Sequence, residues 1–265
     1  MTALRLIIAS LALGLAAANS ATADEERAGC AISRGKKCDI ADAIARGLFE
    51  TGLTPIFPSG LRCRQIDEAW AISYRDRRGG KDAYHGGIDI PAPFGTPILA
   101  AADGEVVAIF EGRNSYRGRE IVLRHSPAQT GLKVWTFSAY SHFKTLPKLK
   151  VGDRVRMGTV LGPTGNSGRG REPGIQSTKR RPAIHFAVTY SSGPDFRISR
   201  NEVVVPRNGW WADPLAFLSG RMPLDSRVLA ARPASQKAVA IGAMLMDGTI
   251  VPPKARVIWP YACQG

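Results

Sequence analysis

The hydrophobic pattern of this 265-residue chain starts with one long apolar run and then breaks into shorter segments. The long run covers residues 6–18, after the single basic residue Arg5 and before Ala21-Thr22-Ala23. A positive residue, an apolar stretch and small residues in this order are typical of a secretory signal peptide. We therefore expect residues 1–23 to be removed and the mature chain to be exported, periplasmic or extracellular in the cell envelope. No later stretch has the roughly 18 apolar residues needed to cross a bilayer, so we expect no transmembrane segment in the mature chain.

A second pattern begins at Asp39. Apolar residues from Ile40 to Leu48 recur at helical spacing, which predicts a short amphipathic helix with Asp39 as N-cap and Gly52 just past its end. We expect its apolar face to pack on the main domain. The following "TPIFPSG", residues 54–60, contains two prolines and a glycine and predicts a linker or turn.

From about residue 70 to residue 220 the apolar residues form short runs broken by Gly, Pro and Asp, such as "REIVLRH" and "IHFAVTY". This spacing predicts an antiparallel all-β domain. Further on, Asp247-Gly248 lies between two apolar runs and predicts a β-hairpin. The expected organisation is a signal peptide (1–23), an N-terminal helical segment and linker (24–69), a β domain (70–220) and a C-terminal extension (221–265).

Four cysteines are present in the chain: Cys30, Cys38, Cys63 and Cys263. An oxidising compartment favours disulfides, and the absence of a Cys-x-x-Cys pair argues against a zinc ribbon. Of the three possible connectivities we expect Cys30 with Cys38 and Cys63 with Cys263.

The chain is strongly basic, with 36 Lys and Arg against 22 Asp and Glu and a net charge of +14. Such a charge favours an anionic partner. For an exported protein we expect a cell-wall polymer, lipopolysaccharide or anionic membrane before nucleic acid. The alternative is a charge that serves only solubility.

Three residues are candidates for a metal site. His85 and Asp89 flank two glycines in "YHGGIDI", and His185 lies in the strand-like "AIHFAV". On a straight strand His85 and Asp89 would be about 13 Å apart, but glycine allows the chain to curl and bring them together. Two nitrogens and one carboxylate form the three-ligand set that leaves Zn²⁺ an open position. The alternatives are a turn closed by Asp89 and a buried structural imidazole at His185.

Six motifs in order resemble those of the M23 family of zinc metallopeptidases, the LytM/lysostaphin-type peptidoglycan endopeptidases. They are "HGGIDI", "GTPILAAADGEVV", "AYSHF", "LGPTGNSG", "IHFAV" and "DPLAFL", within about residues 70–220. The resemblance implies a mainly β, antiparallel LytM/lysostaphin-type (duplicated-hybrid-like) domain, here with a short N-terminal helix and a C-terminal β-hairpin extension. It also implies a zinc-dependent endopeptidase that hydrolyses peptide bonds in peptidoglycan stem peptides or cross-links.

By this resemblance His85, Asp89 and His185 would bind Zn²⁺, and His142 of "YSHF" would be the catalytic acid-base partner. The chain departs from the family at Ala183, because the last family motif is His-x-His and this chain has Ala-x-His. Loss of an acid-base or oxyanion group typically lowers the rate by about 10²- to 10⁴-fold. The resemblance therefore implies a weakened enzyme unless another group substitutes.

Two substitutes are available in the sequence. A basic segment precedes Ala183 and contains Arg169, Arg171, Lys179, Arg180 and Arg181. As an insertion folded over the groove, this segment would deliver Lys179, Arg180 or Arg181 to the carbonyl oxygen of the substrate. We also predict that Arg180 and Arg181 contact substrate carboxylates, the alternative being a solvated basic loop. Otherwise His142 performs both tasks.

The remaining candidates near these motifs have structural alternatives. Tyr140 is predicted to line the substrate groove, with a core tyrosine as the alternative. His125 is expected at the surface or a strand end, without a catalytic role. The glycines of "GNSG", residues 165–168, are expected to form a structural turn.

Two rival functions remain open. One is a catalytically impaired zinc-containing LytM-like module that binds peptidoglycan or activates another cell-wall hydrolase. The other is a lipopolysaccharide or membrane-surface binder, which rests on charge alone.

Overall fold

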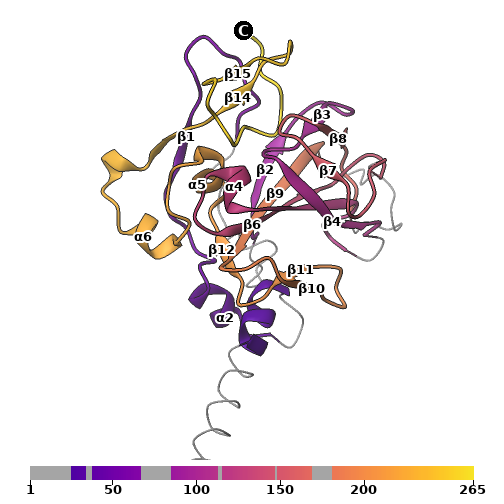
Figure 1. Cartoon of the computed structure of the whole chain (residues 1–265), viewed down its shortest axis with the longest axis vertical. Helices are drawn as coiled ribbons and strands as arrows, with labels where there is room; N and C mark the ends of the chain where they lie inside the picture. Colours follow the sequence, from indigo (N-terminus) through magenta and orange to yellow (C-terminus); the bar gives the residue numbers. More distant parts are fainter. Residues whose placement is uncertain (1–24, 34–37, 67–84, 113–114, 147, 169–180) are drawn as a thin grey trace, which may run out of the picture.

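The computed structural model describes residues 25–33, 38–66, 85–112, 115–146, 148–168 and 181–265. Seven strands form the central sheet: β2 (Ile88–Pro91), β4 (Gly104–Phe110), β5 (Glu120–His125), β6 (Trp135–Ser141), β7 (Arg154–Val155), β9 (Ala183–Ser191) and β12 (Trp210–Ala212). Their order is β12-β9-β6-β5-β4-β7, and β2 also pairs with β9 (Figure 1). All these pairings are antiparallel, which confirms the mainly β, antiparallel fold.

Smaller elements surround this sheet. The strands are β1 (Thr54–Ile56), β3 (Pro97–Leu99), β8 (Val160–Pro163), β10 (Phe196–Ile198), β11 (Val204–Pro206), β13 (Ala238–Ala240), β14 (Ala243–Met244) and β15 (Ile250–Val251). The helices are α2 (Ile40–Ala45), α4 (Pro127–Thr130), α5 (Pro214–Ser219), α6 (Ser226–Ala230) and the 3₁₀ turn η2 (Ala234–Gln236), and residues 25–33 are also helical.

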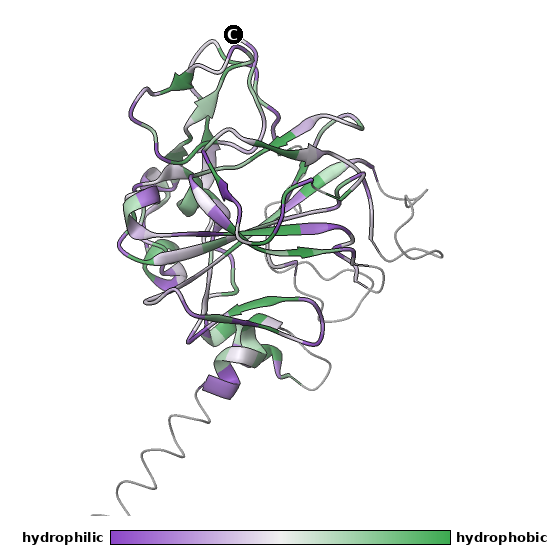
Figure 2. Ribbon diagram, turned by 45° about the vertical axis from the view of Figure 1, so that its right-hand side comes forward, coloured by the Kyte–Doolittle hydropathy of each residue, from purple (hydrophilic) through white to green (hydrophobic). Residues whose placement is uncertain are grey.

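The side chains of strand β9 alternate between the hydrophobic core and the opposite face of the sheet. Successive side chains of a strand point to opposite faces. Ile184, Phe186 and Val188 belong to the main core cluster, and hydrophobic residues dominate the central strands (Figure 2). The alternate residues, including His185 and Ala187, therefore lie on the other face.

The N-terminal helix is shorter than the pattern predicted. Asp39 caps it as expected, since its carboxylate accepts a hydrogen bond from the backbone N–H of Ala41 (2.9 Å). The helix ends at Ala45, and Gly47 takes a left-handed φ of 93°. The reason is tertiary: a Cβ at Gly47 would lie 2.8 Å from the carbonyl oxygen of Trp211, so the chain must turn here to pass that backbone.

The prediction of a linker at residues 54–60 is wrong for its first three residues. Thr54–Ile56 is strand β1, which pairs in parallel with β13. Pro55 is tolerated because this sheet has only two strands, and a proline without an N–H can occupy an edge. In Figure 1 this part of the chain runs along the side of the molecule from α2 towards β14 and β15.

The C-terminal extension is part of the main core. Trp259 and Tyr261 are fully buried and belong to the same hydrophobic cluster as Phe186 of the central sheet. The predicted hairpin is confirmed: β14 and β15 are antiparallel, and Gly248 has a φ of 90° at the turn. The division of the chain at residue 220 therefore does not correspond to a division of the core.

Both expected disulfides are present, Cys30–Cys38 and Cys63–Cys263. The second closes a long loop and joins the segment after β1 to the C-terminal tail. It is reinforced by two backbone hydrogen bonds between Arg62 and Gln264, of 2.8 and 3.0 Å.

The expected signal peptide, residues 1–23, lies outside the described residues, as do Arg169, Arg171, Lys179 and Arg180. Within the described part of the chain, no helix is long and apolar enough to cross a membrane.

His125 ends strand β5 as expected, but it is fully buried and not at the surface. Its Nδ1 donates to the carbonyl oxygen of Asp103 (2.7 Å), and its Nε2 is hydrogen-bonded to the hydroxyl of Ser138 (2.7 Å). The Ser138 hydroxyl also bonds that of Tyr140 (3.2 Å), which accepts from the backbone N–H of Ala101 (2.8 Å). Burial lowers the pKa of His125 from 6.5 to about 4, although the bond to Asp103 partly opposes this shift.

This shift predicts a pH dependence of stability. Because the pKa is lower in the folded protein, the contribution of neutral His125 is complete above pH 6.5 and is lost as the pH falls to about 4. We expect the free energy of unfolding of the wild type to fall over this range by about 3 kcal/mol more than that of His125→Gln. Asp213, whose pKa burial raises to about 6, acts in the opposite direction but is common to both proteins.

Urea unfolding at several pH values measures this difference. Parallel stability profiles of the wild type and His125→Gln would contradict it.

Candidate metal centre and active site

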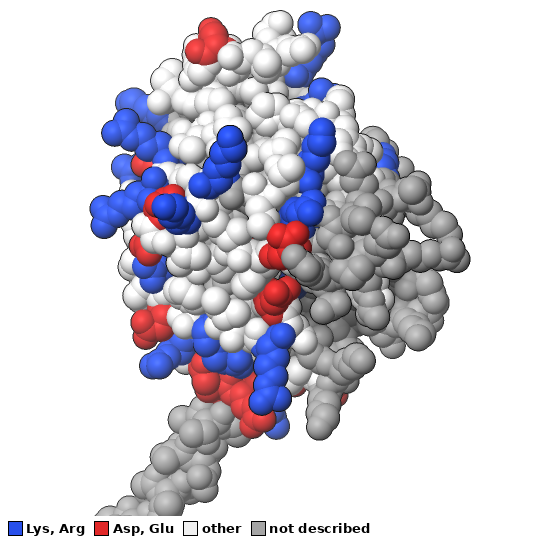
Figure 3. All heavy atoms as spheres, turned by 90° about the vertical axis from the view of Figure 1, so that its right-hand side faces the viewer, with Lys and Arg blue, Asp and Glu red and all other residues white. Residues whose placement is uncertain are grey.

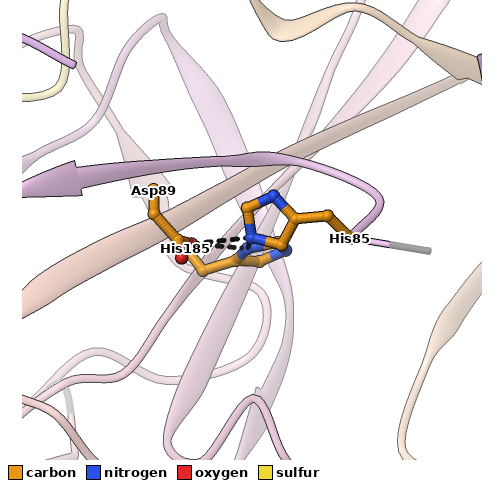
Figure 4. A group of neighbouring side chains, drawn as sticks. All are labelled: His85, Asp89 and His185. Atoms are coloured by element: carbon orange, nitrogen blue, oxygen red, sulfur yellow. Dashed lines mark hydrogen bonds and ion pairs between the residues drawn. The ribbon is translucent and has the colours of Figure 1, made fainter. Parts of the chain in front are cut away.

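The structure brings His85, Asp89 and His185 together, as the resemblance implied (Figure 4). The Nε2 of His85 lies 3.0 Å from Oδ1 of Asp89, and the Nδ1 of His185 lies 3.0 Å from the same oxygen. The two nitrogens are 3.1 Å apart. All three side chains are buried.

Strand pairing and a curled turn create this cluster. Asp89 on β2 is paired directly with His185 on β9, so their side chains leave the same face of the sheet. Gly86 has a left-handed φ of 74°, which turns the chain so that His85 reaches the same point. The proposed role in curling the chain is thereby confirmed for Gly86.

Gly87 has a different function, which no pattern in the sequence indicated. A Cβ at this position would lie 2.6 Å from the backbone oxygen of Phe186, and 2.7 Å from Cε1 and 2.8 Å from Nε2 of His185. The imidazole of His185 therefore occupies the space that any side chain at Gly87 would fill.

We expect Gly87→Ala to weaken zinc binding by about 10- to 100-fold, because the added methyl group pushes His185 from its position. Competition with a chromogenic chelator measures the zinc dissociation constant. Gly95→Ala is the matched control, because a Cβ at that glycine meets nothing within 4 Å, although its positive φ of 88° also causes strain. Equal zinc affinity in Gly87→Ala and wild type would refute the steric argument.

The geometry of the cluster fits zinc. Zinc bonds of about 2.0–2.1 Å in a tetrahedral arrangement place ligand atoms about 3.3 Å apart, close to the spacing of the three donor atoms. Burial of Asp89 alone would raise its pKa, but hydrogen bonds from His185 and His85 and their charges outweigh burial and hold the pKa well below its usual range. The carboxylate is therefore ionised at neutral pH, as a metal ligand must be.

His142 lies beside this cluster, with its ring centroid 6.0 Å from that of His185. Its φ of 71° is left-handed, which is rare for a residue with a side chain. The alternation of β6 would point residue 142 to the core face together with Tyr140. The left-handed backbone instead accompanies a ring turned towards His185.

A hydrogen bond fixes the tautomer of His142. Its Nδ1 lies 2.7 Å from the carbonyl oxygen of Ser167. A carbonyl only accepts, so Nδ1 carries the proton and Nε2 carries the lone pair in the neutral ring. The "GNSG" turn therefore orients His142 as well as connecting strands.

A buried polar network next to His185 was not predicted. Ser141 pairs with His185 across β6 and β9, and its hydroxyl donates to Oε2 of Glu120 (2.6 Å). The Nε of Arg117 lies 3.0 Å from the same oxygen. A carboxylate at the start of the otherwise apolar run "EIVL" was the available signal.

Ala183 pairs with Pro91 and lies on the same face as His185, two residues away on β9. Its methyl group is buried and offers no proton donor or acceptor. Any assistance at this position must come from a different residue.

The structure describes two of the three predicted substrate-binding residues, and these two lie in different environments. Tyr140 is fully buried, packs on Phe186 and lies on the face opposite His185, so the groove position predicted for it is wrong and the core alternative holds. Arg181 is half-buried and lines an open depression beside the start of β9. Arg180 lies outside the described residues.

Comparison with known proteins agrees with these motifs. The model of peptidase family M23 matches residues 83–197, which contain all four site histidine and aspartate positions described above. Residues 83–197 thus match peptidase family M23, and we call them the M23 domain. The M23 domain contributes β2 to β9, whereas β12, α5 and the buried C-terminal tail lie beyond it.

Several curated relatives match part of this chain. The DD-carboxypeptidase/endopeptidase Mpg of Neisseria meningitidis is 31% identical over 123 residues, 46% of this chain and 23% of that protein. The peptidoglycan DD-endopeptidase ShyC of Vibrio cholerae is 34% identical over 90 residues, 34% of this chain and 18% of that protein. The L-Ala--D-Glu endopeptidase of Bacillus subtilis is 30% identical over 139 residues, 52% of this chain and 38% of that protein. The match thus spans about a quarter of the length of the first of these relatives.

Solved structures also match. LytU is 25% identical with a TM-score of 0.40, covering 64% of this chain and 94% of that one. The catalytic domain of lysostaphin from Staphylococcus simulans is 24% identical with a TM-score of 0.33, covering 46% of this chain and 76% of that one.

Proposed function

We propose that this protein is an exported zinc-dependent peptidase that hydrolyses peptide bonds in peptidoglycan stem peptides or cross-links. The observation that carries the proposal is the buried cluster of His85, Asp89 and His185 inside an M23 domain, with donor atoms at zinc-compatible spacing. Relatives named as peptidoglycan endopeptidases support the choice of substrate.

Each residue has a defined task in this proposal. His85, Asp89 and His185 would hold zinc, and a bound zinc ion would supply a Lewis acid that polarises a carbonyl and makes water more acidic. The Nε2 of His142 accepts a proton from the attacking water, and the resulting imidazolium can donate one to the leaving amine. The hydrogen bond from Nδ1 to the carbonyl oxygen of Ser167 places the lone pair of the neutral ring on Nε2, the atom that this exchange uses.

Ala183 favours a second candidate function. A module that retains the three ligands but lacks a second acid-base group could bind peptidoglycan or activate another cell-wall hydrolase. The lipopolysaccharide or membrane-surface alternative needs a concentrated basic surface. On the face in Figure 3, Lys and Arg side chains are interspersed with Asp and Glu.

The deciding experiment is digestion of purified peptidoglycan by the zinc-loaded mature protein, with the products identified by mass spectrometry. We expect new peptide termini, and we expect His142→Ala to lower their rate of formation by about 10²- to 10⁴-fold with unchanged zinc content. The wild type treated with a chelator is the control for metal dependence.

The outcomes separate the candidates. Bound zinc without cleavage would support the binding or activating module, and salt-sensitive binding that is indifferent to zinc would support a surface binder. Full activity of His142→Ala would remove this residue from the proposed mechanism.

A further inference from the structure

The backbone of residues 117–119 lies beside His142 and bonds its main chain. The backbone N–H of His142 donates to the carbonyl oxygen of Arg117 (3.0 Å). The next backbone N–H, that of Phe143, donates to the carbonyl oxygen of Arg119 (3.3 Å). A left-handed backbone in a residue with a side chain is unfavourable and persists only where its surroundings enforce it. These two hydrogen bonds help to keep His142 at its φ of 71°.

The same segment fixes the carbonyl group that orients the His142 ring. The backbone N–H of Arg119 donates to the hydroxyl of Ser167 (3.0 Å), and the carbonyl oxygen of Ser167 is the partner of Nδ1 of His142 (2.7 Å). Gly118 has a φ of 61°, and a Cβ there would lie 2.3 Å from the carbonyl carbon of Ser167. Only glycine allows the two backbones to approach this closely. Residues 117–119 therefore hold both the main chain of His142 and, through Ser167, its ring.

The side chain of Arg117 anchors this segment to the sheet. Its Nε lies 3.0 Å from Oε2 of Glu120, a buried carboxylate that also accepts from the hydroxyl of Ser141 (2.6 Å). Glu120 is paired with Ser141, and Ser141 is paired with His185. Residues paired directly across strands carry their side chains on the same face. The ion pair of Arg117 and Glu120 therefore lies on the face of the sheet that carries His185.

The guanidinium of Arg117 also bonds the loop between β10 and β11. Its Nη2 donates to the carbonyl oxygens of Asn201 (3.2 Å) and Glu202 (2.8 Å), which lie in that loop. Both residues lie beyond residues 83–197, the range of the M23 domain. Arg117 thus joins a loop outside the M23 domain to the segment that holds His142.

The hairpin of β10 and β11 is itself packed on the His185 face of the sheet. Val204 of β11 belongs to one buried cluster with Phe137 of β6. Phe137 lies four residues before Ser141 on this strand, so both side chains leave the same face. The loop that Arg117 bonds therefore has a fixed position relative to the sheet.

We infer that Arg117 is a positioning residue: its side chain, held by Glu120 and the β10–β11 loop, keeps the backbone of His142 in the orientation that the acid-base step requires. This inference rests on the proposed peptidase function. Arginine suits the task because its planar fork presents several N–H donors in fixed directions, so one side chain bonds a carboxylate and two carbonyl oxygens together. A loop outside the M23 domain thereby contributes to the orientation of His142.

The test compares Arg117→Gln with Arg124→Gln in the zinc-loaded protein. Arg124 is the matched control, because it also pairs with a carboxylate, that of Glu105 (3.0 Å), and also donates to a carbonyl oxygen beside the same hairpin, that of Pro194 (3.2 Å). The side chains of Arg117 and Arg124 are 22% and 23% exposed. Arg124 lies four residues from Glu120 along β5, roughly 13 Å away.

We expect Arg117→Gln to lower kcat for a synthetic stem peptide by about 10- to 100-fold, because a displacement of about 1 Å in a catalytic group is enough for such a loss. KM and zinc content should stay within about twofold of the wild type, since the substitution removes no ligand and no substrate contact. Arg124→Gln should keep the wild-type kcat. Arg117→Lys should lose less than Arg117→Gln, because its ammonium group can still pair with Glu120.

Nuclear magnetic resonance of protein with ¹⁵N-labelled histidine gives a readout that is independent of activity. In the wild type and in Arg124→Gln we expect a resolved proton resonance on Nδ1 of His142, protected by the hydrogen bond to Ser167. In Arg117→Gln we expect this resonance to broaden or disappear, because the ring is no longer held in one orientation.

Three results would each overturn the inference: a wild-type kcat in folded Arg117→Gln, an unchanged Nδ1 proton resonance in that variant, or an equal loss of kcat in Arg124→Gln. Circular dichroism shows whether the variants fold, and if Arg117→Gln does not, Arg117→Lys is judged by the same criteria. If the wild type cleaves no peptide, the proposed function fails separately. The Nδ1 proton resonance of His142 then decides alone whether Arg117 positions this residue.

Discussion

His85→Ala is expected to abolish both zinc binding and hydrolysis. The substitution removes one of three donor atoms that lie within 3.1 Å of one another. The remaining nitrogen and carboxylate are too few ligands to hold zinc. We expect at least about a 10⁴-fold loss of activity, because water activation and carbonyl polarisation disappear together. Zinc content by mass spectrometry and peptidoglycan hydrolysis are measured on the same sample.

The matched comparison is the wild type stripped of metal by a chelator, which should show the same loss and recover on addition of zinc. His85→Ala should not recover. Hydrolysis at the wild-type rate by a folded, zinc-free His85→Ala protein would refute both the metal site and the function proposed from it.

Ala183→His is expected to raise kcat by about 10²- to 10⁴-fold with little change in KM, because it restores an acid-base group beside the metal centre. The new imidazole would leave the same face of β9 as His185 and stand next to Pro91. Steady-state kinetics with a fluorogenic stem peptide measure this effect, and zinc content shows whether the ligands are undisturbed.

Ala187→His is the matched control. Ala187 also lies two residues from His185 on the same face, but it packs against the cluster formed by Trp211 and the N-terminal segment. A histidine there should give no gain. A rate for Ala183→His that is unchanged, with zinc retained, would show that His142 or another residue already performs the missing task.

The strands of the central sheet and the curl between His85 and Asp89 could be predicted because their signals are local, whereas the meeting of His185 with this pair, 100 residues away from His85, was implied by the family resemblance. Short apolar runs between turn residues predict strands, and alternation assigns His185 and Ala183 to one face. The two glycines after His85 indicated the curl that brings it to Asp89. These inferences need only neighbouring residues, and the structure agrees with them.

The errors arise where distant parts of the chain meet. Strand β1 was read as a linker because Pro55 argues against a strand, and its partner β13 is far along the chain. The predicted helix stops at Ala45 because the backbone of Trp211 passes Gly47. No pattern of hydrophobic residues in either segment contains this information.

The orientation of His142 could not be predicted for a related reason. Strand alternation assigns this residue to the core face, whereas its left-handed backbone accompanies a ring turned towards His185. Tyr140 follows the strand alternation and lies in the core, so the prediction that it lines the groove is wrong. Only the resemblance of "YSHF" to a family motif indicated the role of His142.

The shared core of the M23 domain and the C-terminal tail bears on how this protein can be engineered. Trp259 and Tyr261 lie in one cluster with Ile184 and Phe186, the residues on either side of His185. A fragment cut at residues 83 and 197 would leave the core face of β9 uncovered directly behind His185. The M23 domain of this chain is thus not expected to fold alone, and a fusion to another protein would have to include both flanking segments and the Cys63–Cys263 disulfide.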